Sequence, residues 1–263
     1  MSRADDLERI RAALLRAGAI LKQFSPAAVG IRYKLTNSPV TDADVAVDEA
    51  LRAELPRGDE GWLSEESADD RVRLERRRVW IVDPLDGTRE FIEGVPQWTV
   101  SIGLAEDGEA VAGGVYNPST DELFLGSPET GATLNGTPLM VSSRSTLEDA
   151  TVLSNRWSLR KRPAEFAPQP FRVLVVNALA YSLALVAAGR ADALWSPSQK
   201  HEWDTAAGTA LIRAAGGEVT TYDGGPIRFN QWPPRAPGIV ATNAAVRHAV
   251  QRFLARLPKA RRR

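Results

Sequence analysis

Two acidic residues at the end of an apolar strand are the clearest candidates for chemistry in this sequence. Within the segment WIVDPLDGTREF, a short strand over 79–82 ends at Asp83, and Asp86 follows with Pro84 between the two acids. Proline fixes φ and removes a hydrogen-bond donor, so the turn that separates the acids is stiff. Two carboxylates on one stiff turn can bracket a divalent cation, and oxygen ligands without His or Cys favour Mg²⁺ over zinc.

The residues after this turn suit a phosphate group. Gly87 allows the backbone to approach a ligand closely. Thr88 adds a hydroxyl and an amide at the start of a predicted helix that contains Phe91 and Ile92. Free amides at a helix start hold phosphate well. The segment therefore predicts a metal site joined directly to a phosphate site.

Other acidic residues occur where each has a structural role open to it. Thr41 and Asp44 in VTDAD have the spacing of a capping box. Asp204 in EWDTAAG opens a predicted helix, where an N-cap Asp contributes ~1 kcal/mol for structural reasons alone. Glu65 and Glu66 in LSEES fit a solvated turn. Taken one at a time, these acids indicate capping and solvation more readily than catalysis.

The composition removes several classes of function. The 263 residues include 33 Lys plus Arg and 33 Asp plus Glu, so no net field favours nucleic acid or an anionic membrane. Cys is absent, which excludes disulfides, thiolate catalysis and Cys-ligated zinc, and two His leave little material for Ser-His-Asp chemistry. No apolar run approaches the ~20 residues that span a bilayer, and MSRADDLERI has no signal core. We expect a cytoplasmic protein whose last residues, KARRR, form a solvated end.

The elements of the first half follow from apolar spacing and turn residues. Apolar residues at alternating spacings of three and four predict an amphipathic helix over 7–24, and a second helix begins near Asp44. Residues 71–78 are predicted to be a charged, exposed connector. Short strands broken by turn signals fill 99–141, with a hairpin turn at Asn135-Gly136.

The pattern changes after Ser142. ATVLS predicts a strand over 150–154, and LAYSLALVAAG predicts a buried helix that closes at Gly189. WDTAAGTALIRAAGG is a helix stopped by two glycines, and PGIVATN is a strand that leads into a last helix from Asn243. We therefore predict two α+β halves, 1–145 and 146–263.

Four blocks of the sequence together resemble the inositol monophosphatase superfamily of Mg²⁺-dependent, lithium-sensitive phosphatases. They occur in the family's order: SPVTDAD (38–44), LSEES (63–67), WIVDPLDGTREFIEGVPQWTVSIGL (80–104) and EWDTAAGTALIRAAGGEV (202–219). The resemblance implies a layered αβαβα sandwich of two α+β halves with the site between them. It also implies a homodimer, whereas the expectation of no nucleic acid or membrane as partner comes from the composition.

The resemblance assigns roles to individual residues. The implied ligands of two or three Mg²⁺ ions are Glu65, Asp83, the main-chain carbonyl of Leu85, Asp86 and Asp204. Asp44 and Thr88 resemble the pair that orients the attacking water, and Glu65 is counted with them as catalytic. Gly87 and Thr88 would supply amides to the phosphate, while Glu66 is either a supporting acid or a neighbour.

The substrate is predicted from a smaller set of residues. Arg89-Glu90-Phe91 together with EWDTAAG resembles the 3′(2′),5′-bisphosphate nucleotidase branch, so we expect hydrolysis of adenosine 3′,5′-bisphosphate. GVPQWTVSIGL is shared with simple inositol phosphatases, so an inositol or sugar monophosphatase is the alternative. Ala178-Leu179 stands where the family has Gly-Ser or Gly-Thr, which normally contact the substrate beyond the phosphate; Ala178 is therefore a candidate contact.

A basic segment after the strand 150–154 has two interpretations. Arg156, Arg160, Lys161 and Arg162 form either a site for a second phosphate or a solvated loop. The neighbouring Trp157 either stacks on a base or packs in the core. A non-catalytic protein of the same fold is disfavoured because no metal-site acid has been replaced, and a nucleic-acid-binding protein lacks a recognition motif.

Overall fold

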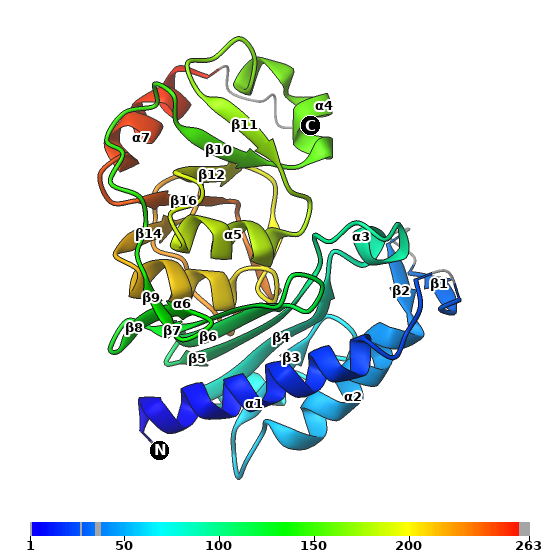
Figure 1. Cartoon of the computed structure of the whole chain (residues 1–263). Coiled ribbons are helices and arrows are strands. Elements are labelled where there is room, and N and C mark those ends of the chain that lie inside the picture. Colours follow the sequence, from blue (N-terminus) through cyan, green and yellow to red (C-terminus); the bar gives the residue numbers. More distant parts are fainter. Residues whose placement is uncertain (1, 27, 35–37, 258–263) are drawn as a thin grey trace.

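The computed structural model describes residues 2–26, 28–34 and 38–257, so the predicted solvated end KARRR lies outside the described residues (Figure 1). The helices are α1 (Arg3–Leu21), α2 (Asp42–Glu54), α3 (Thr88–Ile92), α4 (Arg156–Lys161), α5 (Leu179–Ala187), α6 (Ala206–Ala214) and α7 (Arg247–Arg256). The strands of the first half are β1 (Ile31–Tyr33), β2 (Pro39–Thr41), β3 (Gly61–Ser64), β4 (Arg78–Asp86), β5 (Thr99–Glu106), β6 (Glu109–Asn117), β7 (Glu122–Ser127), β8 (Gly131–Leu134) and β9 (Thr137–Leu139). Those of the second half are β10 (Thr151–Ser154), β11 (Arg172–Val175), β12 (Ala193–Ser196), β13 (Lys200–His201), β14 (Gly217–Thr220), β15 (Arg235–Ala236) and β16 (Ile239–Asn243).

A seven-stranded sheet forms the centre of the first half. Its order is β3-β4-β5-β6-β7-β8-β9, and only the pair β3–β4 is parallel. Helices α1 and α2 lie along one face (Figure 1), where Leu14 and Leu51 are fully buried in a common core with Trp80 and Val82. The predicted period of the first helix is thus confirmed.

A five-stranded sheet forms the centre of the second half, in the order β11-β10-β12-β16-β14. Strand β10 is parallel to both of its neighbours, whereas β16 is antiparallel to β12 and β14. Helix α7 covers one face, together with a buried aromatic group that includes Phe171 and Trp195. The strands predicted at 150–154 and 237–243 are therefore confirmed.

Helices α5 and α6 fill the layer between the two sheets (Figure 1). The contact of α6 with the larger sheet is very close, because a Cβ on Gly103 would lie 2.7 Å from the Cβ of Ala206 and one on Gly113 would lie 2.5 Å from the carbonyl oxygen of Ala207. Glycine at these two positions lets the helix backbone rest directly on the strands. The order of layers is αβαβα, which confirms the predicted fold.

In the region 71–86 one prediction was wrong, and the predicted exposure of the connector 71–78 has one buried exception, Arg73. Strand β4 does not end at Asp83 but continues to Asp86 through an irregularity in its pairing with β5, which accommodates Pro84. Arg73, in the connector predicted to be exposed, is only 2% exposed. Its guanidinium pairs with Asp69 at 2.8 Å and donates to the side chain of Asn230 at 2.7 Å.

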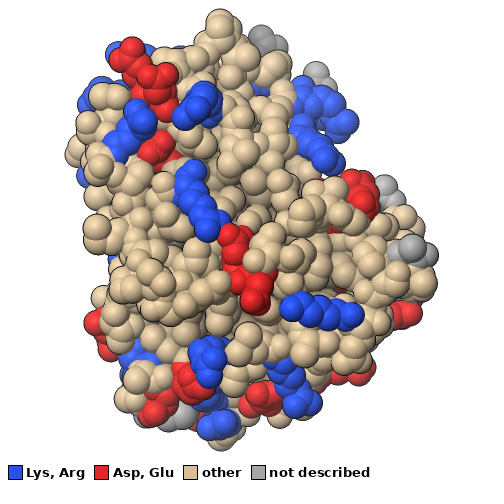
Figure 2. All heavy atoms as spheres, viewed as in Figure 1, with Lys and Arg blue, Asp and Glu red and all other residues tan. Residues whose placement is uncertain are grey.

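The hairpin prediction is confirmed, since Asn135 and Gly136 both have positive φ between β8 and β9. Within the described residues, no helix combines the length and the apolar character needed to cross a bilayer. On the face shown in Figure 2, basic and acidic side chains are interspersed rather than gathered into one large area of a single sign.

Candidate active site

Three acids that are far apart in the sequence converge between the two halves. Carboxylate oxygens of Glu65, Asp83 and Asp204 all lie within 4.8 Å of one another. Glu65 directly follows β3, which pairs in parallel with β4 so that Ser64 lies beside Val82. The two strands therefore deliver Glu65 and Asp83 to the same edge of the larger sheet.

The third acid reaches this edge from the loop before α6. The helix begins after Thr205, so the predicted N-cap role of Asp204 is wrong, and its carboxylate is free to face the other acids. The hydroxyl of Ser101 in β5 donates to the carbonyl of Trp203 at 3.3 Å. This bond fixes the loop to the strand next to β4.

Asp86 is held in a different way from the other acids. Its Oδ1 accepts the amide of Leu179 at 3.2 Å and its Oδ2 accepts the amide of Ala180 at 2.6 Å. These are amides of the first turn of α5, which lack partners within the helix. Asp86 therefore joins the larger sheet to a helix of the second half, and each of its oxygens keeps a second lone pair for a further partner.

Asp44 and Thr88 lie side by side, as a water-orienting pair must. The capping box predicted for Thr41 and Asp44 is confirmed, because Asp44 Oδ2 accepts the Thr41 amide at 2.8 Å. The other oxygen, Oδ1, is 3.1 Å from the Thr88 hydroxyl, which also lies 3.0 Å from the carbonyl oxygen of Leu85. Asp44 thus caps the start of α2 with Oδ2 and faces Thr88 of α3 with Oδ1.

Gly87 forms the tight turn between β4 and α3. Its φ of 93° is unfavourable for any residue with a side chain, and an added Cβ would lie 2.9 Å from the carbonyl oxygen of Gln97. The methyl group of Ala178 packs against the same turn and is 1% exposed. Ala178 therefore supports the turn and offers almost no side-chain surface to a ligand.

The acids of the site disfavour one another's ionisation. Burial raises the pKa of Asp83 and of Asp204 well above the usual range, and the charge of Glu65 raises both further. Burial also raises the pKa of Asp86 to about 7, although the amides of Ala180 and Leu179 oppose the rise. A bound cation would reverse this preference.

Lys34, which was not predicted, and Glu66, for which two roles were open, both lie near the acids of the site. The ammonium of Lys34 lies 2.8 Å from Glu65 Oε1 and 2.7 Å from Glu66 Oε1. Burial raises the pKa of Glu66 to about 7, while the bond to Lys34 opposes the rise. No local signal marks Lys34, because its partners lie more than 30 residues away. Lys34 follows β1, and the contact depends on how this segment is placed beside the end of β3.

The basic segment lines a separate cavity of about 360 Å³ between α3 and α4. Arg156 and Arg160 from α4 and Arg89 from α3 contribute to its wall. Trp157 is also part of the wall and is 46% exposed, so the interpretation of this residue as core packing was wrong. Arg156 forms a loose ion pair with Glu93 at 3.7 Å.

The donor set fits a hard divalent cation. Three carboxylates from separate segments meet without a His or Cys among them, and burial raises the pKa of two of them, Asp83 and Asp204. Oxygen-only sites of this kind suit Mg²⁺, Ca²⁺ or Mn²⁺.

Comparison with known proteins agrees with this geometry. The model of the inositol monophosphatase family matches residues 5–260. The chain is 35% identical to the inositol-1-monophosphatase of Mesorhizobium japonicum and 34% identical to the Nus factor SuhB of Xylella fastidiosa, in each case over about four fifths of both chains.

Solved structures give the same result. The extragenic suppressor protein suhB of Bartonella henselae superposes with a TM-score of 0.82 at 31% identity, covering 96% of this chain and 99% of that one. The inositol monophosphatase of Anabaena superposes with a TM-score of 0.78 at 31% identity over 97% of each chain. The chain belongs to the inositol monophosphatase family and is a phosphoric monoester hydrolase.

Proposed function

We propose that the protein hydrolyses the phosphate monoester of an inositol or a related sugar and that it depends on Mg²⁺. The observation that supports this most directly is the convergence of Glu65, Asp83 and Asp204. The relatives named above include an inositol-1-monophosphatase and no bisphosphate nucleotidase. Our first expectation, the nucleotidase branch, is therefore replaced by its alternative.

The roles implied by the family resemblance form part of this proposal. The metal ligands would be Glu65, Asp83, the carbonyl of Leu85, Asp86 and Asp204, with two or three ions in the site. The half formed by 1–145 would supply most ligands, and the half formed by 146–263 would supply Asp204 and the substrate contacts. Bound Mg²⁺ would neutralise the phosphate and lower the pKa of water.

The residues of the chain have distinct tasks in this scheme. Asp44 Oδ1 faces the hydroxyl of Thr88 and would accept a proton from the attacking water. Burial raises the pKa of Asp44, which makes it a better proton acceptor than an exposed carboxylate. The turn at Gly87 brings the backbone amides of residues 87 and 88 toward the phosphate. Positioning and charge neutralisation supply most of the barrier reduction in phosphoryl transfer, so no nucleophilic side chain is required.

The test measures phosphate release from inositol 1-phosphate and from adenosine 3′,5′-bisphosphate, in Mg²⁺ with and without Li⁺. We expect inositol 1-phosphate to be the better substrate and Li⁺ to inhibit. Full activity after exhaustive dialysis against EDTA would contradict the proposal, because the acids could then not act through a cation.

A bisphosphate remains the second candidate because of one observation. The cavity between α3 and α4 carries three guanidinium groups and an exposed indole, from Arg89, Arg156, Arg160 and Trp157. If a second phosphate binds there, Arg156→Ala raises KM for the bisphosphate and hardly alters KM for a monophosphate. Equal changes for both substrates would separate this cavity from substrate binding.

A homodimer is the last part of the proposal, and it rests on the family resemblance. The chain has a mass of 28.6 kDa, so light scattering distinguishes a dimer from a monomer directly. A monomer at micromolar concentration would contradict the prediction.

A further inference from the structure

A small cavity lies beside the acids of the site, on the side of the second half. Its wall includes Ser154 at the end of β10, Asn177 and Leu179 at the start of α5, and Lys200 in β13. The amide of Leu179 binds Asp86, so the cavity adjoins that carboxylate. The space inside is about 20 Å³, enough for one water-sized group.

One hydroxyl in this wall is buried without a partner. Ser154 is 5% exposed, and its Oγ forms no hydrogen bond with any of the described residues. A buried hydroxyl without a partner costs ~1–3 kcal/mol. An oxygen atom from outside the protein, placed in this cavity, would remove that cost.

The amide side chains nearby cannot fill this need, because they already have partners. Asn155 Oδ1 accepts the amide of Ser158 at 2.7 Å. Asn177 donates to Glu90 at 2.7 Å and accepts the amide of Arg156 at 3.0 Å. Within the wall of this cavity, Ser154 Oγ and the indole nitrogen of Trp195 are both buried without a hydrogen-bond partner among the described residues, and Lys200 adds a charged donor.

Lys200 is half-buried beside the acids. Among the residues that the structure describes, its ammonium has no hydrogen-bond or ion-pair partner. Burial lowers the pKa of Lys200, and the charges of Asp204 and Asp86 act in the opposite direction. The acids therefore attract this cation toward the site without pairing with it directly.

We propose that Lys200 and Ser154 form a subsite for one hydroxyl group of the alcohol that leaves the phosphate, so that the enzyme favours phosphate esters of polyols. The ammonium can only donate, and it would donate to the oxygen of the substrate hydroxyl. Ser154 Oγ would accept the hydrogen of that same hydroxyl. The cavity is too small for a second phosphate, which limits the group bound there to one oxygen atom. This inference rests on the function proposed above.

The experiment compares two esters in Mg²⁺: myo-inositol 1-phosphate, whose leaving group carries hydroxyls, and 4-nitrophenyl phosphate, whose leaving group carries none. Lys200→Met keeps an unbranched side chain that is one atom shorter and removes the charge. We expect kcat/KM for inositol 1-phosphate to fall about tenfold to a hundredfold, as for a lost hydrogen bond to a charged group. For 4-nitrophenyl phosphate we expect a change below about threefold.

Ser154→Ala tests the second half of the subsite, and the double variant tests whether the two groups act together. Since both would bind the same hydroxyl, the double variant should lose less than the product of the single losses. Lys22→Met, at an exposed lysine after α1, is the matched control and should behave as wild type. Lys200→Arg should recover part of the activity toward inositol 1-phosphate.

Binding supplies a readout that does not depend on turnover. In an Asp44→Asn background, calorimetric titration with inositol 1-phosphate should show the same loss of affinity on Lys200→Met. Equal losses of kcat/KM for both esters, or no loss for either, would overturn the subsite while leaving the phosphatase intact. If the wild type cleaves only 4-nitrophenyl phosphate, the polyol preference is wrong. If it cleaves neither ester, the proposed function fails first, and the subsite fails with it.

Discussion

The protein contains two clusters of buried charge, and they differ in how the charges are paired. The ion-pair cluster lies between α1 and the edge of the larger sheet and mixes both signs: Asp6, Arg9, Glu60, Arg78 and Glu106. The acid cluster of the site consists of Glu65, Asp83, Asp86 and Asp204, and among the described residues only Glu65 of these four has an ion-pair partner, Lys34. The two clusters lie in the same half of the fold except for Asp204.

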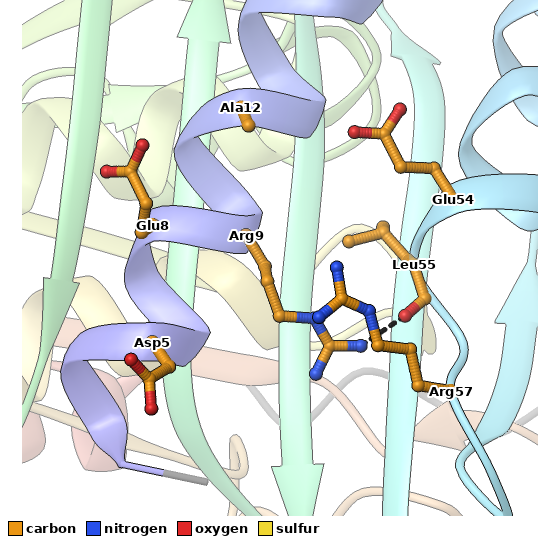
Figure 3. Close-up of a pocket in the computed structure, with 7 residues that line it drawn as sticks. All are labelled: Asp5, Glu8, Arg9, Ala12, Glu54, Leu55 and Arg57. Atoms are coloured by element: carbon orange, nitrogen blue, oxygen red, sulfur yellow. Dashed lines mark hydrogen bonds between the residues drawn. The ribbon is translucent and has the colours of Figure 1, made fainter.

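In the ion-pair cluster every acid has a basic neighbour. Arg78 lies 2.6 Å from Asp6 and 3.1 Å from Glu60, and Arg9 lies 2.7 Å from Glu60. Figure 3 shows Arg9 pointing from α1 toward the carbonyl of Leu55, at the end of α2 opposite to Asp44, beside a cavity of about 450 Å³. Although burial opposes the change, bonds from Arg9 and Trp80 lower the pKa of Glu60 to about 2.

The comparison shows how a fold separates charges that hold it together from charges that serve a reaction. Opposite charges at short range stabilise each other, and the pKa of Glu60 falls. Like charges buried together do the reverse, and the pKa of Asp86 rises to about 7. Such an arrangement is costly without a cation, which makes it a sign of function rather than of stability.

Replacing one acid of the site should give the largest effect. Asp83→Asn removes a ligand from the acid cluster, and we expect kcat/KM to fall by about a thousandfold or more, since metal charge contributes several kcal/mol to such reactions. Without Mg²⁺ the same variant should unfold at a higher urea concentration than wild type, because repulsion is relieved. A variant that keeps most of its activity would remove Asp83 from the site.

Replacing one acid of the ion-pair cluster should do the opposite. Glu60→Gln removes the buried carboxylate that Arg9 and Arg78 share, and we expect a loss of about 3 kcal/mol in the free energy of unfolding. Activity per folded molecule should not change, because the cluster lies away from the reacting groups. Urea unfolding and steady-state kinetics on the same sample test both statements, and a large loss of kcat would show that the clusters are coupled.

The effect of pH should also have opposite sign for the two clusters. Above the unfolded pKa of ~4, the folded metal-free protein keeps protons on Asp86 and Glu66 up to about pH 7, whereas the unfolded chain has lost them. Stability in EDTA should therefore fall as pH rises from 5 to 8, by up to ~1.4 kcal/mol per unit for each such proton. Saturating Mg²⁺ should abolish this fall.

Glu60 in the ion-pair cluster affects the free energy of unfolding at acid pH instead. Its pKa of about 2 lies below the unfolded value, so its contribution is present above pH ~4.5 and is lost as pH falls toward 2. Glu60→Gln should therefore weaken the dependence of the free energy of unfolding on pH below pH ~4.5 and leave it unchanged at higher pH. A wild-type curve in EDTA that is level between pH 5 and 8 would contradict the repulsion described for the site.

An exposed ion pair should give the smallest effect. Arg16 and Glu54 lie 3.4 Å apart with side chains 63% and 36% exposed. Water screens such a pair, so Arg16→Ala should change the free energy of unfolding by less than about 0.5 kcal/mol. A loss near that of Glu60→Gln would mean that burial does not decide the contribution of these charges.

The sequence predicts those parts of this picture that depend on local spacing. The capping box at Thr41 and the turn at Gly87 before α3 follow from a few adjacent residue types. Partners brought together by sheet pairing cannot be predicted in this way. Arg73 stands in a run of charged residues that is typical of an exposed segment, but it is buried, and its guanidinium bonds to Asn230, 157 positions away, as well as to Asp69.

The contact of Lys34 with the site had no signal either, and neither did the cavity at Lys200. Both depend on where a loop is placed against a sheet edge, which residue types alone do not specify. The exposure of Trp157 is the converse case: an aromatic residue usually packs inside, but α4 is a short surface helix and leaves the indole uncovered.

The bonds of Asp86 to the first turn of α5 have a mechanical consequence. If the two halves moved apart by even an ångström or two, the amides of Leu179 and Ala180 would lose their acceptor, and the carboxylate would turn away from its neighbours in the same motion. Asp86 therefore couples the contact between the two halves to the geometry of the acid cluster. A descendant that abandoned catalysis would still be under pressure to keep this aspartate, so its presence by itself says less about activity than the presence of Asp83.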